Sequence, residues 1–181
     1  MKILLPNIVM LSSSSFIHIQ MYQSPVGKIV LGSYDSKICL ANWSDKKKSD
    51  CTNHRLKKSL DAVFVEETSE IIDETMKQLD EYFKGERQHF DIPLLMVGTA
   101  FQKSVWNALL QIPFGETASY AAQAKQIGNE KAVRAVANAN AANAISILIP
   151  CHRIIGSDGT LTGYAGGLDA KKVLLALEKG E

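Results

Sequence analysis

The residues of this chain with the clearest chemical potential stand side by side at Cys151, His152 and Arg153. The runs before and after them, residues 145–149 and 154–155, are almost entirely apolar, so the three polar groups are expected in a dry interior. A cysteine acts as a nucleophile through its thiolate, and a free thiol is only a few per cent ionised at neutral pH. The pattern therefore indicates a cysteine nucleophile that needs a neighbouring base.

The base expected at this position is His152. Neighbouring residues on an extended strand point to opposite sides, so His152 can reach the Cys151 sulfur only if Pro150 bends the strand, or through one water molecule, which we favour. A neutral imidazole that relays a proton also needs a carboxylate behind it, and Glu178 is the best-placed candidate by chain order. On spacing alone, a buried structural thiol is the more common explanation of Cys151.

The first half of the chain has the alternating pattern of a small sheet that could support such a site. Short strands are expected at residues 16–22, 28–34, 37–43 and 63–65, with turns at residues 24–27 and 35–36. The first three form an antiparallel meander, and residues 63–65 form a last strand. The polar stretch at residues 46–52 is expected to be a solvated loop, followed by a short helix at residues 53–60. An amphipathic helix at residues 69–85 completes a small α/β unit.

Beyond a linker at residues 87–99, the pattern becomes helical. Helices are expected at residues 101–110, 119–126, 130–142 and 168–179, with a turn at 157–160 and a loop at 161–167 before the last one. The second and third helices have the lengths of a helix-turn-helix. The third consists mainly of Ala, Val and Asn, and Arg134 is its only long cation beyond the first turn. The small side chains allow this helix to approach a nucleic-acid groove closely, and they are equally compatible with burial of the helix in the core.

The overall composition is that of a globular protein without a strong charge. The 181 residues are 46% hydrophobic, and 20 Lys and Arg against 19 Asp and Glu give a formal net charge of +1, so a nucleic-acid partner must be met by a local patch. Three cysteines are too few for a disulfide framework and lack paired zinc-ligand spacing. No apolar stretch of the sequence is long enough to span a bilayer. Residues 1–15 are expected to be a start extension or disordered arm rather than a secretory signal.

The segment from Ile147 to Gly156, reading Ile-Leu-Ile-Pro-Cys-His-Arg-Ile-Ile-Gly, closely resembles the active-site signature of the O6-alkylguanine-DNA alkyltransferases. The resemblance continues from Phe101 to Glu178, and weakly through Ser24-Pro25-Val26-Gly27. It implies an α+β fold. Residues 1–93 form an N-terminal domain of the ribonuclease H-like type, a small antiparallel sheet with a helix. Residues 94–181 form a C-terminal winged helix-turn-helix domain that binds DNA and accepts the alkyl group.

The resemblance also implies roles for the residues of the catalytic group. Cys151 is the acceptor of the alkyl group, and His152 with Glu178 completes a Cys-water-His-Glu relay similar to a hydrolase triad. Asn143 orients the site by hydrogen bonding. Tyr120 donates a proton to the ring nitrogen of guanine as the base leaves. The reaction is DNA repair by direct reversal, and each molecule acts once, without a cofactor or metal.

A second group of residues is implied in DNA binding. Arg134 takes the place of the nucleotide that is flipped out of the duplex. Tyr164, in the loop at residues 161–167, walls the guanine pocket, and Asn129 and Ser157 contact phosphates. The implied partner is double-stranded DNA containing O6-alkylguanine, bound through its minor groove.

Some positions depart from the family pattern. Ala165 and Ala144 replace residues that bear on pocket size and on the rigidity of the approach to the active strand, and the zinc ligands of some members are not evident. A monomer in the cytoplasm, where thiols stay reduced, is expected. Two alternatives remain: a cysteine hydrolase that uses the same Cys-His-Glu set with repeated turnover, and a helix-turn-helix regulator in which Cys151 only packs.

Overall fold

The computed structural model describes residues 15–44 and 46–181, and this part of the chain has an α+β architecture. The predicted N-terminal arm lies outside the described residues except for Ser15, which begins the first strand. The strands are β1 (Ser15–Ser24), β2 (Gly27–Tyr34), β3 (Lys37–Trp43), β4 (Ala62–Val65), β5 (Ala118–Ser119) and β6 (Ile154–Ile155). The helices are α1 (Lys46–Leu60), α2 (Glu70–Phe83), α3 (Ala100–Leu109), α4 (Tyr120–Gln126), α5 (Val133–Ala141) and α6 (Gly167–Lys179), with the 3-10 helices η1 (Glu130–Ala132) and η2 (Cys151–Arg153).

The N-terminal half is a mixed sheet in the order β3-β2-β1-β4. The three strands of the predicted meander pair antiparallel, but β4 lies beside β1 and runs parallel to it, with Ser15 opposite Ala62. Helix α1 carries the chain from one edge of the sheet to the other, and a crossover of that length is what a parallel pair requires. The prediction of a purely antiparallel sheet is therefore wrong for its fourth strand.

Helix α1 also corrects the expected loop at residues 46–52, because the helix begins at Lys46. The start of this segment has no apolar repeat to reveal a helix, although lysine is a good helix former. The apolar residue that holds the helix to the sheet comes later in the chain, at Leu56, which is fully buried. Leu56 packs with Ile17, Cys39, Leu40 and Ala62 in a small core between α1 and the sheet.

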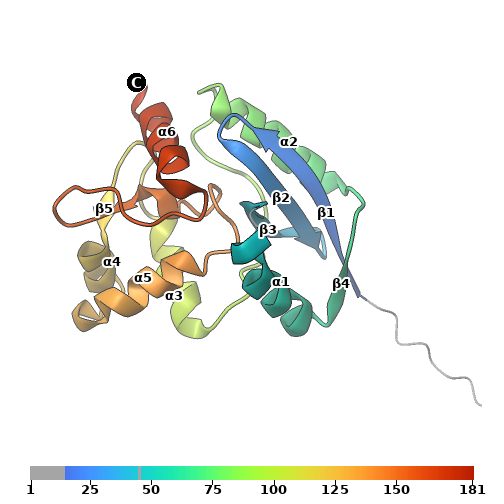
Figure 1. Ribbon diagram of the computed structural model, residues 1–181, viewed down its shortest axis with the longest axis horizontal. Coiled ribbons are helices and arrows are strands. Elements are labelled where there is room, and N and C mark those ends of the chain that lie inside the picture. Colours follow the sequence, from blue (N-terminus) through green and yellow to red (C-terminus); the bar gives the residue numbers. More distant parts are fainter. Residues whose placement is uncertain (1–14, 45) are drawn as a thin grey trace, which may run out of the picture.

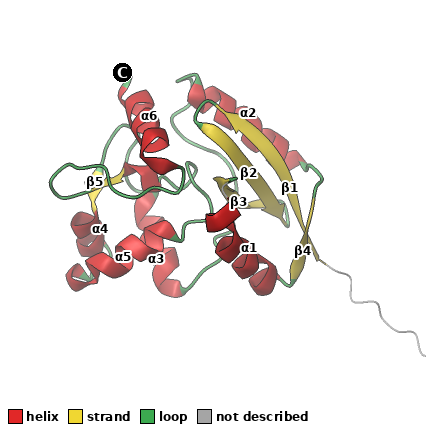
Figure 2. Cartoon of the chain, in the orientation of Figure 1, coloured by secondary structure: helices red, strands yellow, loops and turns green. Residues whose placement is uncertain are grey.

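The C-terminal half matches the helices predicted from the sequence. Thr99 caps α3 with a reciprocal capping box, and Ser119 caps α4. A turn at Gly128, which has a positive φ of 74°, separates α4 from η1 and α5, so the helix-turn-helix is present. Strands β5 and β6 pair beside it, and Figure 2 shows these helices gathered on one side of the molecule and the large sheet on the other.

The edge strand β3 joins the two halves. Ala41 exchanges backbone hydrogen bonds with the segment before the active-site loop, donating to the Ala144 oxygen at 2.8 Å and accepting from the Ser146 nitrogen at 2.7 Å. Ile38 makes the same kind of pairing with the linker around Leu94. The site loop is therefore anchored to the sheet of the other half (Figure 1).

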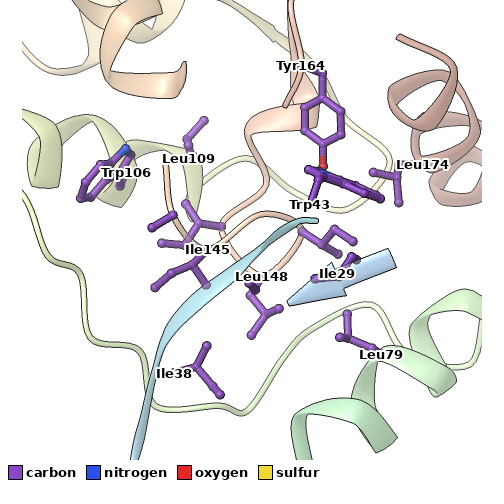
Figure 3. Packing of buried hydrophobic residues seen from close by; sticks show 14 of the residues in the cluster. Ile29, Ile38, Trp43, Leu79, Trp106, Leu109, Ile145, Leu148, Tyr164 and Leu174 are labelled. Carbon is purple, nitrogen blue, oxygen red and sulfur yellow. The ribbon is translucent and has the colours of Figure 1, made fainter. Parts of the chain in front are cut away.

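One continuous hydrophobic core extends from the N-terminal half into the C-terminal half. Figure 3 shows Trp43 and Ile38 of the sheet in one cluster with Ile145 and Leu148 of the loop and Leu174 of α6. Among the helices of the described residues, none is long and apolar enough to cross a bilayer.

Candidate active site

The Pro-Cys-His-Arg segment is a tight turn and not the extended strand that the sequence suggested. Pro150 has φ −81° and ψ 63°, and Cys151–Arg153 forms the 3-10 helix η2. Proline fixes φ, so it sets the bend at the point where the apolar run ends. The turn is held from behind by Asn143, whose amide nitrogen donates to the Ile149 oxygen at 2.9 Å and whose amide oxygen accepts from the Ile145 nitrogen at 3.0 Å.

Glu178, near the end of α6, is the centre of the site. Its side chain is fully buried, and the carboxylate oxygen Oε1 lies 2.8 Å from His152 Nε2. Arg153 spans both oxygens, with Nε 2.8 Å from Oε2 and Nη2 3.0 Å from Oε1. Burial by itself raises the pKa of Glu178, but hydrogen bonds and charge from His152 and Arg153 outweigh it and lower this pKa to about 2. The carboxylate is therefore ionised and accepts the Nε2–H of a neutral imidazole.

Two further groups donate hydrogen bonds to the Glu178 carboxylate. The Tyr82 hydroxyl donates to Oε1 at 2.8 Å, and the Gly115 nitrogen donates to Oε2 at 3.2 Å. Gly115 has φ 79°, and a Cβ there would lie 2.8 Å from the backbone oxygen of Glu178. Only glycine allows the chain to pass so close to the carboxylate. Each oxygen of the carboxylate is thus paired with several donors.

Cys151 is a half-buried residue, and its thiol lies among groups that act on its charge in opposite directions. Burial raises the pKa of Cys151, and the Asn143 amide and the Lys171 ammonium partly offset this rise. Burial also lowers the pKa of His152, against the opposing influence of Glu178. The resting site therefore holds a protonated thiol beside a neutral imidazole, so ionisation of the thiol must accompany the reaction.

The other ring nitrogen of His152 is available for the proton of the thiol. Nδ1 is buried and has no hydrogen-bond partner among the described residues, and no direct bond joins His152 to the Cys151 sulfur in that part of the chain. With Nε2–H directed to Glu178, Nδ1 carries the lone pair. The geometry brings together the three members of the predicted relay, and the bridging water stays a prediction.

The sequence reasoning missed Lys171, which is fully buried on α6. Its ammonium donates to the backbone oxygens of Ile154 and Thr162. Burial lowers the pKa of Lys171, and the nearby Cys151 raises it. The signal was present in the helical spacing, because Lys171 lies three residues before Leu174 and seven before Glu178, on the face that α6 buries.

The loop at residues 161–167 closes the site on the side of α4. Thr162 Oγ1 donates to the Tyr120 hydroxyl at 3.2 Å, so the predicted proton donor is held at the first residue of α4. Ala165 is half-buried in this loop. A Cβ on Gly166 would lie 2.3 Å from the Trp43 indole, so the loop presses against the sheet at this glycine.

Tyr164 lies inside the molecule and not at its surface. Its ring packs edge-on against Trp43 at 5.9 Å and against His152 at 6.3 Å, and only 7% of the residue is exposed. Figure 3 shows the Tyr164 hydroxyl directed at Trp43. The ring that was predicted to wall the guanine pocket therefore lies inside the molecule beside His152, and its contact with a bound base stays a prediction.

The other predicted DNA contacts are on the surface. Arg134 on α5, Asn129 before η1 and Ser157 in the turn after β6 are all exposed. Asn129 stands at the N-cap position of η1, but its side chain makes no capping hydrogen bond. Ala144 is buried and pairs with β3 through its backbone.

A cavity of about 390 Å³ lies behind the turn, between it and the linker. Pro150 and Arg153 line it together with residues of the linker such as His89 and Phe90, whereas Cys151 and Tyr120 do not. It is therefore not the pocket expected above the thiol. In the described part of the chain, no group of His, Cys, Asp and Glu residues is arranged to hold a metal ion.

Comparison with known proteins agrees with this architecture. Residues 17–96 match the model of the ribonuclease-like domain of 6-O-methylguanine DNA methyltransferase, and residues 100–180 match the model of its DNA-binding domain. The methylated-DNA--protein-cysteine methyltransferase of Methanosarcina acetivorans is 46% identical over 158 residues, which are 87% of this chain and 95% of that protein. That of Mycobacterium leprae is 42% identical over 163 residues, 90% of this chain and 93% of that protein.

Solved structures give the same result. The crystal structure of Mycobacterium tuberculosis O6-methylguanine methyltransferase has a TM-score of 0.76 at 38% identity, covering 91% of this chain and 93% of that chain. Mycobacterium tuberculosis OGT in complex with DNA also has a TM-score of 0.76 at 38% identity, over 90% of this chain and 93% of that chain. The predicted fold class is thereby confirmed.

A ribonuclease-like domain, joined to a DNA-binding domain that carries a cysteine beside a buried His-Glu pair, defines a class of DNA-modifying protein. Within that class, the chain belongs to the O6-methylguanine-DNA methyltransferase family.

Proposed function

We propose that this protein repairs DNA by direct reversal, taking the alkyl group of an O6-alkylguanine irreversibly onto Cys151. The observation that carries the proposal is the buried His152–Glu178 pair next to the half-buried residue Cys151, with the second imidazole nitrogen unpaired among the described residues. Membership of the family and the DNA complex of a relative support the same reaction. Cys151 is the one residue whose loss must abolish it.

In the reaction, the Cys151 sulfur forms a bond to the alkyl carbon as the bond from that carbon to guanine O6 breaks. The thiol proton passes to His152 Nδ1, directly or through a water molecule, while Glu178 holds Nε2–H. The Lys171 ammonium stabilises the developing thiolate, because an opposite charge in a dry site lowers its energy. Tyr120 donates a proton to the ring nitrogen of the leaving guanine, which departs as the neutral repaired base. The proton on His152 then returns to the Tyr120 phenolate through water, so the net change moves the thiol proton to guanine.

The product at the sulfur is a thioether, which none of the groups around it can cleave. Each molecule therefore acts once, and the step balances without a cofactor. Asn143 supports the reaction by holding the turn on which Cys151 lies.

For the DNA, we propose a double-stranded partner bound through the minor groove by α5 and the turn before it. Arg134 is exposed on an otherwise slim helix and is able to fill the place of an extruded nucleotide. Asn129 and Ser157 are exposed and able to contact phosphates. Binding of this kind positions the duplex without reading its sequence, and one protein molecule suffices.

The test is mass spectrometry of the Cys151 peptide after mixing the protein with duplex DNA that carries one O6-methylguanine. The expected result is a gain of one methylene mass on Cys151, with one methyl group transferred for each protein molecule. Cys151→Ser should bind the duplex and gain nothing. Repeated turnover of an ester or amide would indicate a cysteine hydrolase instead, and sequence-selective DNA binding unaffected by Cys151→Ser would indicate a regulator.

Two broader expectations belong to the same proposal. Cys39, Cys51 and Cys151 are all unpaired, and a reactive thiol suits a cytoplasmic location, where thiols stay reduced. The division into domains at residues 1–93 and 94–181 is supported by the linker that precedes α3.

A further inference from the structure

One donor to the catalytic carboxylate comes from the other half of the molecule. Tyr82 lies in the last turn of α2, which packs on the N-terminal sheet, and is 96 residues away from Glu178 in sequence. Its hydroxyl lies 2.8 Å from Glu178 Oε1, the same oxygen that lies 2.8 Å from His152 Nε2. The N-terminal half therefore reaches the site through one hydroxyl group.

The ring of Tyr82 is fixed by its neighbours. It is fully buried and packs at 5.4 Å against Phe90 of the linker and at 6.2 Å, edge-on, against Phe114 after α3. The Arg153 guanidinium lies over the Phe114 ring, 5.8 Å from its centroid. Aromatic pairs of this geometry hold their rings firmly, so the direction of the hydroxyl is set by packing.

The hydroxyl acts as a donor. Glu178 is ionised and can only accept, and burial together with the charge of Glu178 raises the pKa of Tyr82 far above the working range. The phenol thus stays protonated whenever the site is active. Among the described residues, it is the only neutral side-chain hydroxyl bonded to this carboxylate.

We propose that Tyr82 is a positioning residue of the alkyl-transfer site, orienting Glu178 so that Oε1 accepts the Nε2–H of His152. This fixes the imidazole tautomer and leaves the Nδ1 lone pair for the thiol proton. Without the hydroxyl, Arg153 still neutralises the carboxylate and contacts both of its oxygens, but Oε1 loses the one neutral donor that helps to direct it at His152. The inference rests on the proposed function of Cys151 and makes the N-terminal half part of the chemistry.

The test is Tyr82→Phe, which keeps the ring in its aromatic surroundings and removes only the hydroxyl. The expected result is a fall of about tenfold in the single-turnover rate of methyl transfer, with DNA affinity unchanged because Tyr82 is buried. Nitrogen-15 NMR of the His152 ring should show a loss of the Nε2–H tautomer. Arg153 and Lys171, which also act on the titration of His152, and the Tyr164 ring against it are unaltered in the variant.

Tyr22→Phe is the matched control. Tyr22 also lies in the N-terminal half, and its hydroxyl donates to Asp80 at 2.8 Å, so the same chemical group is removed from the same kind of bond. The control should keep both the wild-type rate and the His152 tautomer. Equal rates for the two variants, or an unchanged tautomer in Tyr82→Phe, would overturn the proposal.

Two measurements keep the outcome clear. If Tyr82→Phe does not fold, 3-fluorotyrosine is placed at position 82, where its hydroxyl is a stronger donor than that of tyrosine. The His152 Nε2–H resonance should then move, because both donors share Oε1. An unmoved resonance would overturn the proposal. The NMR readout needs no DNA. If the unaltered protein fails to methylate Cys151, the proposed function fails, while the tautomer still tests Tyr82.

Discussion

Replacing Glu178 by glutamine removes one charge from the centre of the site and leaves its size almost unchanged. Both oxygens of the carboxylate accept hydrogen bonds, Oε1 from Tyr82, His152 and Arg153 and Oε2 from Arg153 and Gly115. A glutamine amide can accept at only one of these positions. In either orientation its NH₂ group faces other donors, and the buried Arg153 guanidinium loses its counter-charge.

Two independent routes give the size of the effect. Removing one partner of a buried ion pair costs about 3–5 kcal/mol. The pKa of Glu178 falls from an ordinary 4.5 to about 2, and at about 1.4 kcal/mol for each tenfold change this corresponds to about 3 kcal/mol at neutral pH. Because the folded state has the lower pKa, this stability is fully present above pH 4.5 and is lost as the pH falls toward 2.

The assay is guanidinium unfolding, followed by tryptophan fluorescence, of wild type and Glu178→Gln at pH 7 and pH 3. We expect a difference in the free energy of unfolding of about 3 kcal/mol at pH 7 and about half of that or less at pH 3. The control is Glu81→Gln, which breaks a surface pair with Arg87 at 2.7 Å and should cost about 1 kcal/mol or less. A Glu178→Gln difference equal to that of the control, or independent of pH, would refute the reasoning. The rate of methyl transfer should also fall by about 10²–10⁴-fold, as for the loss of general-base assistance.

Other predictions follow from the same geometry. Lys171→Met should raise the pKa of the acceptor thiol further, so that methyl transfer slows about tenfold at pH 7 and recovers at higher pH; the exposed neighbour in Lys172→Met should leave the pH–rate profile in place. Arg134→Ala should leave the melting temperature unchanged and slow transfer from duplex DNA about tenfold or more, but not transfer from the free alkylated base, which needs no extrusion. Gly166→Ala should cost about 1–3 kcal/mol in thermal unfolding, because its Cβ would lie 2.3 Å from an indole ring.

Patterns within one element were enough to predict much of the fold and part of the site. The apolar spacing of α3 to α6 placed these helices within a few residues of their true limits, and the resemblance around Cys151 led to His152 and Glu178. Helix α1 was missed at its start because it has no apolar repeat there. The parallel position of β4 depends on that crossover, so it was missed as well.

What the sequence could not supply was contact between elements that lie far apart in the chain. Tyr82 reads as one more apolar position of α2, and only the folded structure shows that its hydroxyl meets Glu178 of α6. Tyr164 was predicted to wall the guanine pocket from its loop, and only the folded structure shows that its ring packs against both Trp43 and His152. Side-chain direction in an irregular loop depends on tertiary packing, which the local pattern does not encode.

The environment of His152 suits a single transfer better than repeated hydrolysis. In a hydrolase triad the carboxylate stabilises the imidazolium that forms in each cycle. Here burial lowers the pKa of His152, Glu178 opposes this change, and the charges of Arg153 and Lys171 lower the pKa further. Such an imidazole holds a proton poorly and must pass it on. That suffices when the thiol is deprotonated once and then becomes a thioether, whereas a hydrolase must hold and return the proton at every turnover.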